Sequence, residues 1–542
     1  MSKCETKSES EFYKYFDLPN PGLRSYFDGV VKGNSEIYHS PWIKSESNEG
    51  ILRDLKRIMQ EWMPHLKTLA KEWPSLYEFE EDLAAKVGPM SVKKPLKERM
   101  DDIEAYYDGI LLPAEPVAET AIQKTIYKFR KAKGLRLRSQ ERTADLMKKS
   151  TNSGAPYFLK RRQVVGKTLP CELASEGRLQ VLHHCLSDEE KFNVCAILGW
   201  RGQEGGPKPE DVKQRVVFMF PFAVNILELQ VYQPLIEVFQ RFNYVPAWVS
   251  MDEVDRSITR LFDTKGHDDV VICTDFSKFD QHFNGVMQDA AKSILSGILT
   301  PSHESKEWLK NVFPVKYNIP LAYDWSCVRT GKHGMGSGSG GTNADETLAH
   351  TALQIEAATQ HGSELNPNSM CLGDDGVLTY PGITVEDVVQ SYTSHGLEMN
   401  PDKQYVSKHD CVYLRRWHHQ NYRVDGVCVG VYSTARALGR LCMQERFYDP
   451  EDWGPKMVAL RELSIIENCK NHPLFEEFAD FCMKRDKFRL GLDIPGFLDN
   501  IDKEAKKATD NMPDFLGYTK TLQKADKGIS DWRIVKYLKS KL

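Results

Sequence analysis

Hydrophobic residues recur at helical spacing towards both ends of the chain. Apolar side chains separated by three or four positions, with charged residues between them, mark the buried face of a helix. The first such stripe comprises Ile51, Leu52, Leu55, Ile58, Met59, Trp62 and Met63. The later stripes comprise Met457, Leu460, Leu463 and Ile466, followed by Leu474, Phe475, Phe478 and Phe481. We therefore expect helices over residues 51–90, punctuated at Pro64 and Pro74, and again beyond Pro450.

The centre of the chain has a different pattern, with short apolar runs typical of buried strands. Residues 266–276, GHDDVVICTDF, form a β-branched run bounded by glycine and acidic residues. A second strand candidate, residues 369–378, is interrupted by Gly373-Asp374-Asp375. Residues 421–432 hold two apolar runs around Asp425-Gly426, which is a strong signal for a β-hairpin. Helices, then a mixed centre, then helices predict an α+β protein with its chemistry in the middle.

Composition describes an ordinary globular protein. The 542 residues suggest about three or four folding units, and the hydrophobic and charged fractions, 41% and 27%, exclude a disordered or fibrous chain. The polar start predicts no secretory signal, and the most apolar window, residues 216–227, is too short to span a bilayer. Twelve scattered cysteines without a C-x-x-C pair favour free thiols in a reducing compartment. The final Ser540-Lys541-Leu542 matches a peroxisomal address, which we interpret as a chance match on a Lys-rich terminal helix.

The formal charge of −4 is unevenly distributed. Residues 124–167 carry 14 basic residues, opposed only by Glu141 and Asp145. This stretch is therefore +12, which leaves −16 for the rest of the chain. A long basic stretch in an acidic protein indicates a local polyanion-binding surface. The alternative is a solvated helix face.

Carboxylates gather in two central segments. In TDFSKFDQHF, Asp275 emerges at the end of the expected strand and Asp280 follows five residues later. In CLGDDGVL, the apolar flanks predict a hairpin whose tight turn presents Asp374 and Asp375 together, with glycine on either side for backbone freedom. Clustered carboxylates repel one another without a cation, so this site requires Mg²⁺. Two such ions, about 3.5–4 Å apart, activate an attacking hydroxyl and stabilise a leaving pyrophosphate.

A glycine-rich loop lies between these two segments. The sequence GMGSGSGGTNADETLAH places Ser337-Gly338, Gly340, Gly341 and Thr342 just before an expected helix over residues 344–350. Exposed backbone N–H groups and a helix start suit phosphate or a nucleic-acid backbone. The alternative, a flexible linker, is unusual between two buried strands.

The order DxxxxD, SGxxxT, GDD resembles palm motifs A, B and C of viral RNA-dependent RNA polymerases. Ser337 and Asp374 follow Asp275 by 62 and 99 residues. The motif sequences TDFSKFDQHF, SGSGGT and CLGDDG are most similar to those of picobirnavirus polymerases. The resemblance implies a right-hand fold with an N-terminal helical extension, residues 1–110, that bridges fingers and thumb. It further implies fingers over 111–265, a palm over 266–419 with a fingers insertion near 284–330, and a thumb over 420–542.

The resemblance also assigns roles to individual residues. Asp275, Asp374 and Asp375 would bind two Mg²⁺ ions, with Mn²⁺ able to substitute, and Lys403 of motif D would be a general acid. Nucleotide binding falls to Lys213 and Arg215 of motif F and to Asp280, Ser337, Gly338, Thr342 and Asn343. Template contacts fall to motif G and the basic residues after it: Thr151, Asn152, Ser153, Gly154, Lys160, Arg161 and Arg162. Motif E, with Leu414, Arg415 and Arg416, would support the nascent strand. Lysine and arginine suit phosphate contacts in each case.

One position departs from the family pattern. Many relatives carry Asn four residues after the motif-B threonine, where it helps to read the ribose 2′-hydroxyl. Here that position is Glu346, with Asn343 and Asp345 nearby, so the residue that partners Asp280 stays open. Asp280 itself favours ribonucleotides, because its carboxylate can accept a hydrogen bond from a 2′-hydroxyl.

The sequence thus predicts a template-directed RNA polymerase of an RNA virus, active in genome replication and transcription. Its expected partners are the RNA template and product, ribonucleoside triphosphates and a viral capsid protein. We expect a monomeric enzyme without a membrane partner, located in the virion interior and the host cytoplasm. The alternatives are a reverse transcriptase, a two-metal nuclease and a non-catalytic RNA-binding virion protein. Gly373 and Asp280 disfavour the first, and the intact carboxylates disfavour the last.

Overall fold

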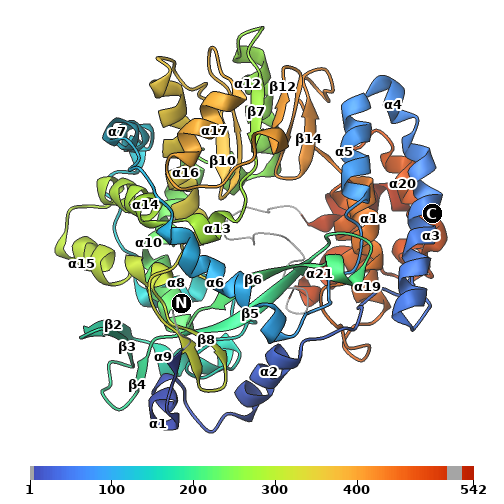
Figure 1. Ribbon diagram of the computed structural model, residues 1–542. Coiled ribbons are helices and arrows are strands. Elements are labelled where there is room, and N and C mark those ends of the chain that lie inside the picture. The colour runs from blue at the N-terminus through green and yellow to red at the C-terminus, as the bar shows by residue number, and fades with distance from the viewer. Residues whose placement is uncertain (1–4, 510–527) are drawn as a thin grey trace. The chain divides into compact units, whose positions relative to one another are not determined.

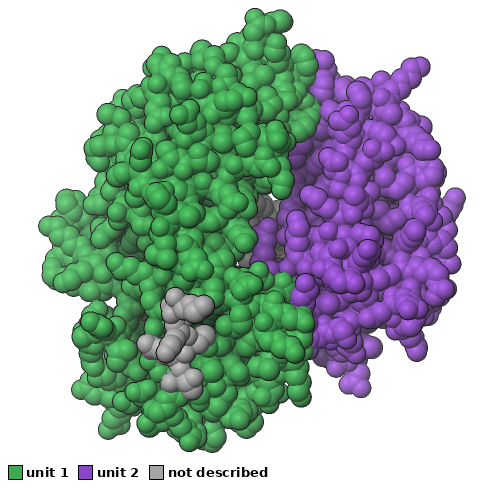
Figure 2. Space-filling model, viewed as in Figure 1, with its two compact units in different colours: residues 1–32, 95–200, 216–411 green, residues 33–94, 201–215, 412–542 purple. Residues whose placement is uncertain are grey.

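The computed structural model describes residues 5–509 and 528–542, and the chain divides into two compact units (Figure 2). Unit 1 comprises residues 1–32, 95–200 and 216–411, and unit 2 comprises residues 33–94, 201–215 and 412–542. Residues 510–527, part of the expected thumb, lie outside the described residues. Because each unit draws on three separate stretches of chain, neither corresponds to a continuous segment of the sequence.

Unit 1 mixes helices with sheets (Figure 1). Its helices are α1 (Glu9–Phe12), α2 (Pro21–Lys32), α6 (Met100–Asp108), α7 (Glu119–Lys128), α8 (Gln140–Leu146), α9 (Arg161–Thr168), α10 (Phe222–Arg241), α11 (Pro246–Val249), α12 (Met251–Thr264), α13 (Phe279–His282), α14 (Gly285–Ile298), α15 (His303–Asn311), α16 (Thr342–Gln360) and α17 (Val385–Thr393). Several begin at a side-chain cap, such as Ser250 before α12 and Thr384 before α17, which satisfies a backbone N–H of the first turn.

The sheet that matters most for function has the order β10-β11-β7-β12. Its strands, all antiparallel, are β10 (Met370–Leu372), β11 (Asp375–Leu378), β7 (Val271–Thr274) and β12 (Tyr405–Ser407). Helix α16 packs against β10 and also against α7, α14 and α17 (Figure 1). Most residues of this helix are buried, polar as well as apolar ones, so it forms the centre of the unit's core.

Other sheets complete the strand inventory. The order β1-β9-β8-β5-β6 joins β1 (Glu5–Thr6), β9 (Cys327–Arg329), β8 (Leu321–Asp324), β5 (Ala196–Gln203) and β6 (Lys213–Met219). A small sheet holds β2 (Cys171–Glu176), β3 (Leu179–His184) and β4 (Lys191–Asn193). The last sheet holds β13 (Asp410–Tyr413), β14 (Arg416–His419) and β15 (Val431–Tyr432).

Unit 2 is mainly helical and has its own core. Its helices are α3 (Asn48–Leu66), α4 (Leu69–Glu72), α5 (Pro74–Ala84), α18 (Thr434–Cys442), α19 (Pro455–Glu467), α20 (Phe475–Arg485), α21 (Ile501–Ala508) and α22 (Arg533–Lys539). Trp62 and Trp417 are fully buried in this core. The Trp62 indole N–H donates to Thr434 Oγ1 at 2.9 Å, which ties α3 to α18.

Most of the expected elements are confirmed. The helices over 51–90 are α3 to α5, those beyond Pro450 include α19 and α20, and the central strands are β7, β10 and β11. Pro74 starts α5, whereas Pro64 lies inside the last turn of α3, which ends at Leu66. The Asp425-Gly426 turn is present, with both residues at positive φ. Only an isolated bridge between Val424 and Val427 flanks it, and the regular strand pairing, between β14 and β15, starts further from the turn. Among the described residues, no helix has both the length and the apolar character needed to cross a membrane.

Candidate active site

The three predicted carboxylates lie at one edge of the four-stranded sheet. Strand β11 runs antiparallel to β7 with Gly376 opposite Thr274. Beyond this last pair, Asp275 follows the end of β7, Asp375 begins β11, and Asp374 precedes it in the turn. Asp275 and Asp374 are exposed and Asp375 is half-buried. The structure therefore brings together the carboxylates that the sequence places 99 residues apart.

A two-residue turn joins β10 to β11 and sets the position of Asp374. Gly373 has φ of +58°, a conformation that costs a side chain strain but is open to glycine. Its N–H donates to Thr347 Oγ1 at 2.9 Å, and its carbonyl lies 2.9 Å from His350 Nδ1. Burial lowers the pKa of His350 to about 4, so the imidazole is neutral and Nδ1–H donates to the carbonyl. Two uncharged side chains of α16 thus hold the turn.

Asp275 is held through its backbone by Gln404. The Gln404 side chain accepts from the Asp275 N–H at 2.7 Å and donates to the Asp275 carbonyl at 3.0 Å. It also donates to the Asn400 carbonyl at 2.9 Å, which links the site to the segment that carries Lys403. Sequence reasoning missed Gln404, although its place directly after Lys403 in motif D was the available signal.

Asp280 has Glu346, the residue at the departing motif-B position, as a neighbour. Glu346 is hydrogen-bonded to Asp280. Burial, the Asp280 charge and hydrogen bond, and the Asp374 charge raise the pKa of Glu346 well above its usual range. Asn343 instead accepts from the Trp248 indole N–H at 2.8 Å. Glu346 therefore occupies the position beside Asp280.

Asp345 belongs to a buried network on the same helix. Its carboxylate lies 3.0 Å from Lys316 Nζ, with both side chains fully buried, and it accepts from the hydroxyls of Tyr232 and Tyr317 at 2.6 Å. Lys316 Nζ also donates to the Phe313 carbonyl at 2.6 Å. A buried ion pair that is fully hydrogen-bonded fixes orientation, so this network anchors the start of α16.

The glycine-rich loop is pinned against its neighbours. Ser337 Oγ donates to the Val216 carbonyl at 3.0 Å, and Thr342 Oγ1 to the Gly336 carbonyl at 3.2 Å. A β-carbon at Gly338 would lie 1.7 Å from the Phe218 carbonyl oxygen, so only glycine fits. These contacts therefore fix the conformation of the loop directly before α16.

The motif-G residues form a compact turn. Asn152 pairs with Lys160, and the Leu159 N–H donates to Ser153 Oγ at 3.1 Å. Gly154 adopts φ of +64°. Lys160 and Arg162 are exposed.

Arg161 has a different environment from its two basic neighbours. Its guanidinium donates to the Lys148 carbonyl at 3.3 Å and to Asn225 Oδ1 at 3.0 Å. It also lies over the Phe222 ring. Burial lowers the pKa of Arg161 to about 10. These contacts give Arg161 a structural role in the turn, whereas Lys160 and Arg162 face solvent.

The motif-F and motif-E residues belong to unit 2. Lys213 and Arg215 are exposed on one side of β6, and Gln214 between them donates to the Val92 carbonyl. Leu414 and Arg415, at φ of +54° and +59°, form the turn between β13 and β14. Arg416 is buried and donates to the Gly430 carbonyl at 3.3 Å. Lys213 and Arg215 are thus exposed, whereas Arg416 supports the sheet.

The donor set at the sheet edge fits a divalent cation. It offers only carboxylate oxygens, which Mg²⁺ prefers, and two of the three side chains face solvent. Within residues 5–509 and 528–542, no three His, Cys, Asp or Glu side chains are already drawn together as a metal cluster. Lys403 lies in the short helix Pro401–Lys403 and is exposed.

Comparison with known proteins decides the family. A model described as viral RNA-dependent RNA polymerase matches residues 71–427. The chain belongs to the viral RNA-dependent RNA polymerases. A "potential RNA-dependent RNA polymerase" of a human picobirnavirus, strain Human/Thailand/Hy005102/-, is 62% identical over 535 residues, covering 97% of this chain and 98% of the relative.

Solved polymerases confirm the expected fold class. The crystal structure of the RNA-dependent RNA polymerase of a human picobirnavirus is 60% identical and has a TM-score of 0.93, covering 99% of this chain and all of that one. An insertion-loop deletion mutant of a human picobirnavirus polymerase gives 58% identity and a TM-score of 0.91, over 99% and 100% of the two chains. This polymerase therefore has the α+β right-hand fold, and polymerases of its family use divalent metal ions.

Proposed function

We propose that this polymerase joins ribonucleoside triphosphates on an RNA template at the edge where β7 meets the β10–β11 turn, and that it thereby replicates and transcribes the genome of an RNA virus. The pairing of β7 with β11 carries this proposal, because it places Asp275, directly after β7, at the same sheet edge as Asp374 and Asp375. Carboxylates at the ends of buried strands are what metal-assisted phosphoryl transfer needs.

Asp275 and Asp374 would hold two Mg²⁺ ions, with Asp375 as a weaker ligand and Mn²⁺ as a possible replacement. When bound, the ions activate the attacking 3′-hydroxyl and neutralise the leaving pyrophosphate. The contribution of the chain is positioning: Gln404 fixes the Asp275 backbone, and Thr347 and His350 fix the turn that carries Asp374. These contacts use backbone atoms of Asp275 and Gly373.

Cationic residues would bind the phosphates and donate a proton to the leaving group. Lys213 and Arg215 present a point charge and a planar fork from one side of β6, both suited to a triphosphate. Lys403 is exposed beside the residue that holds Asp275, and a lysine there would donate a proton to the leaving pyrophosphate. Arg415 and its turn would support the end of the nascent strand.

Ribose selection would fall to Asp280 with Glu346. Glu346 bonded to Asp280 fixes the direction in which the Asp280 carboxyl faces. Asn343, one turn earlier on α16, is oriented by Trp248. Ser337, Gly338 and Thr342 would act through the rigid loop that positions α16.

The domain division inferred from the sequence is retained as part of the proposal. The β10-β11-β7-β12 sheet would be the palm, residues 111–265 the fingers, with an insertion near 284–330, and the described part of 420–542 the thumb. Residues 1–110 contribute to both compact units, which supports their role as a bridge. Template contacts would involve residues 151–154 and the exposed Lys160 and Arg162, with a capsid protein as a further partner. We expect the enzyme to act as a monomer in the virion interior and the host cytoplasm.

The decisive experiment combines a short RNA, Mg²⁺ and labelled nucleotides, with and without a primer. Ribonucleotides should be incorporated and deoxyribonucleotides strongly disfavoured, which separates this activity from reverse transcription. Asp374→Ala should abolish incorporation while RNA binding survives. Asp188→Ala, which removes a carboxylate that is 97% exposed, is the matched control and should behave as wild type. Appreciable synthesis by Asp374→Ala, or RNA cleavage in place of extension, would contradict the proposal.

A further inference from the structure

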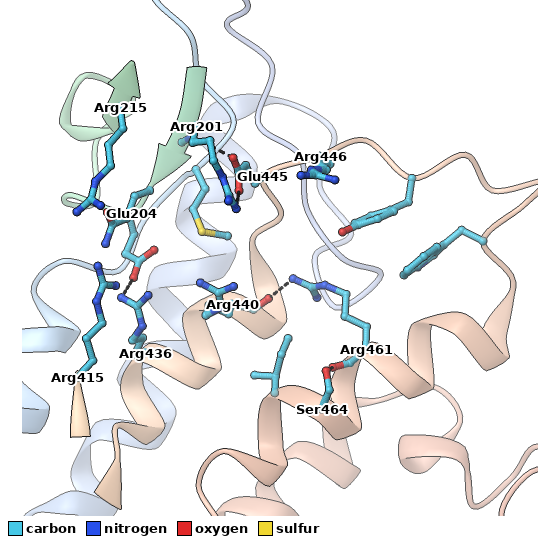
Figure 3. Close-up of a pocket in the computed structure, with 16 residues that line it drawn as sticks. Arg201, Glu204, Arg215, Arg415, Arg436, Arg440, Glu445, Arg446, Arg461 and Ser464 are labelled. Carbon is cyan, nitrogen blue, oxygen red and sulfur yellow. Dashed lines mark hydrogen bonds and ion pairs between the residues drawn. The ribbon is translucent and has the colours of Figure 1, made fainter. Parts of the chain in front are cut away.

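Unit 2 contains a cavity of about 720 Å³ that is lined mainly by arginine (Figure 3). Its lining includes Arg215 and Arg415, which are already assigned to the triphosphate and to the nascent strand. The cavity is therefore part of the role already proposed for these residues. Glu228, near the start of α10 in unit 1, is a charged residue that has no such assignment.

Glu228 is a fully buried acid whose carboxylate contacts the glycine-rich loop, residues 336–342. Ser339 Oγ donates to Glu228 Oε2, and the Gly340 N–H donates to Glu228 Oε1 at 3.2 Å. Burial raises the pKa of Glu228, and the charge of Lys316 and these hydrogen bonds oppose the shift. A buried carboxylate is expensive unless it is hydrogen-bonded, so the loop supplies partners that this position needs.

Asn225, three residues before Glu228 on α10, orients this carboxylate. Its Nδ2 donates to Glu228 Oε1 at 3.2 Å and to the Gly338 carbonyl at 3.3 Å. Its Oδ1 accepts from the Arg161 guanidinium at 3.0 Å. The amide nitrogen and oxygen of this buried side chain are thus both engaged. Asn225 thereby joins the motif-G turn, through Arg161, to the glycine-rich loop.

Ser339 extends the support from Glu228 to the first residue of α16. Its Oγ donates to Glu228 and accepts from the Gly341 N–H at 3.0 Å. Gly341 is the N-cap residue of α16, where a side chain ordinarily satisfies the first backbone N–H groups. It has no side chain, and a β-carbon there would lie 2.3 Å from the Tyr232 ring. The backbone at the start of α16 is therefore held by Ser339 and, behind it, by Glu228.

We propose that Glu228 is a positioning residue for nucleotide use: its buried carboxylate, oriented by Asn225, fixes the glycine-rich loop that leads into α16. The inference rests on the proposed function, because Asn343 and Glu346 follow this loop directly on α16. Glu228 acts only through the loop and does not touch the nucleotide. An apolar side chain would fill the same space but would leave the donors of the loop without their acceptor, so the loop would lose its fixed conformation.

Nucleotide kinetics with the full chain and an RNA template test this role. Glu228→Leu should raise the KM for ribonucleotides by about tenfold, the value of one lost hydrogen bond to a charged group. It should also lower the ratio of ribonucleotide to deoxyribonucleotide kcat/KM, while the Kd for RNA alone stays unchanged. Glu228→Gln keeps an acceptor for the Gly340 N–H and should restore most of the wild-type KM. A wild-type KM in Glu228→Leu would overturn the proposal.

Glu356→Leu is the matched control for Glu228→Leu. Glu356 is also a buried acid of unit 1: it accepts from the Ala118 N–H at 2.6 Å and pairs with His395. It lies about three turns after Glu346 on α16, away from the glycine-rich loop. Its replacement should reduce stability as Glu228→Leu does, without changing the nucleotide KM or the ribose preference. The same rise in KM in both variants would show that destabilisation alone explains the effect, which would contradict the proposal.

Ser339→Ala tests the route through which Glu228 acts. This change removes the same hydrogen bond from the side of the loop, and it keeps the proposal testable if Glu228→Leu does not fold. Because the two residues share one contact, the double variant should have the KM of the more affected single variant. Independent, additive increases in KM would show that Glu228 does not act through Ser339.

Hydrogen exchange provides a measurement that does not depend on activity. The amides of Gly340 and Gly341 should exchange faster in Glu228→Leu and in Ser339→Ala than in wild type, and at the wild-type rate in Glu356→Leu. If the wild-type chain synthesises no RNA, the proposed function fails, whereas the exchange rates still decide whether Glu228 holds the loop. Unchanged exchange in both loop variants would overturn the inference.

Discussion

Two groups of carboxylates in unit 1 meet their surroundings in opposite ways. Asp275 and Asp374 are exposed at the sheet edge, and neutral side chains hold the backbone of Asp275 and of Gly373, the residue before Asp374. Asp345 and Glu346, adjacent on α16, are buried, and Asp345 uses both of its own oxygens for protein contacts. Asp345 has a buried lysine and two tyrosine hydroxyls as partners, and Glu346 is held beside Asp280 with a raised pKa.

Under the proposed function, the difference separates carboxylates for chemistry from carboxylates that support the fold. A carboxylate that binds metal needs a fixed backbone, and here Gln404, Thr347 and His350 hold the backbone around Asp275 and Asp374. A carboxylate that stabilises the fold must satisfy its oxygens internally, because an unpaired buried charge is expensive. Substitutions that affect the first group should therefore reduce activity. Substitutions that affect the second group should reduce stability or nucleotide selectivity.

The largest expected effect is the loss of stability in Lys316→Met. This change leaves Asp345 buried without its cation, which costs about 3–5 kcal/mol. Urea unfolding followed by tryptophan fluorescence measures the shift. Lys191→Met removes the same side chain from an ion pair with Glu176 in which both residues are partly exposed, and it should cost about 0–1 kcal/mol. Equal losses in the two variants would show that the Lys316–Asp345 network does not anchor α16.

Gln404→Ala should reduce activity with little change in folding. Loss of the two hydrogen bonds to the Asp275 backbone lets the carboxylate move, and a displacement of about 1 Å can cost about 100-fold in rate. We expect a fall of about 10–100-fold in kcat and a higher metal concentration for half-maximal activity, with the KM for RNA unchanged.

Gln140 supplies the control for Gln404. Its side chain bonds both the N–H and the carbonyl of Cys171, at 2.9 and 2.8 Å, in the same arrangement but away from the carboxylates. Gln140→Ala should match the stability loss of Gln404→Ala while keeping kcat and the metal dependence of wild type. If both variants lose activity alike, Gln404 is structural only.

Glu346 should show an intermediate effect that depends on pH. Because burial and Asp280 raise its pKa, the unfolded chain releases this proton first as pH rises above about 4.5, so the stability contributed by the group declines with increasing pH. Glu346→Gln mimics the protonated acid, and its stability relative to wild type should increase steadily from pH 5 to pH 8. Unfolding curves across this range measure the difference, and a constant difference would contradict the raised pKa.

The same position tests ribose selection. Glu346→Gln should keep the preference for ribonucleotides, since the amide still donates to Asp280. Glu346→Ala should lower the ratio of ribonucleotide to deoxyribonucleotide kcat/KM by about tenfold, the value of one hydrogen bond. An unchanged ratio in Glu346→Ala would remove Glu346 from selection.

The smallest effect should come from exposed charges near motif G. Lys160→Ala and Arg162→Ala should each lower the salt dependence of template binding by about one unit of slope in log Kd against log salt, because each removes one phosphate contact. Arg161→Ala should instead lower stability, since its guanidinium is engaged by Asn225 and Lys148. Binding titrations at several salt concentrations measure the slope, and identical slopes would exclude Lys160 and Arg162 from the RNA path.

The elements that carry the candidate catalytic residues could be predicted from the sequence because their signals are local. The β-branched run before Asp275, the apolar flanks of the Gly-Asp-Asp turn and the glycine-rich lead into α16 each determine a short element. The supporting contacts could not be predicted in this way. Gln404 lies 129 residues from Asp275, and Lys316 lies 29 from Asp345, with no periodicity that links either pair.

The arginine cavity shows the same limit. Its lining comes from segments as distant as Met90, Arg201 and Arg461, and the basic stretch at residues 124–167 gives no hint of it. Charge density along a chain is visible in the sequence, whereas charge density around a cavity depends on which helices pack together.

The sequence by itself determined the order of the elements, the three carboxylates and the family to which they belong, because strand, turn and helix signals and catalytic motifs are properties of short segments. Only the tertiary structure decided that Glu346 lies beside Asp280, that Asp345 is buried in a network with Lys316, and that arginines from separate segments line one cavity. The physical reason is that burial and pairing depend on neighbours brought together by folding, and the cost of an unpaired buried charge then selects which neighbours are acceptable.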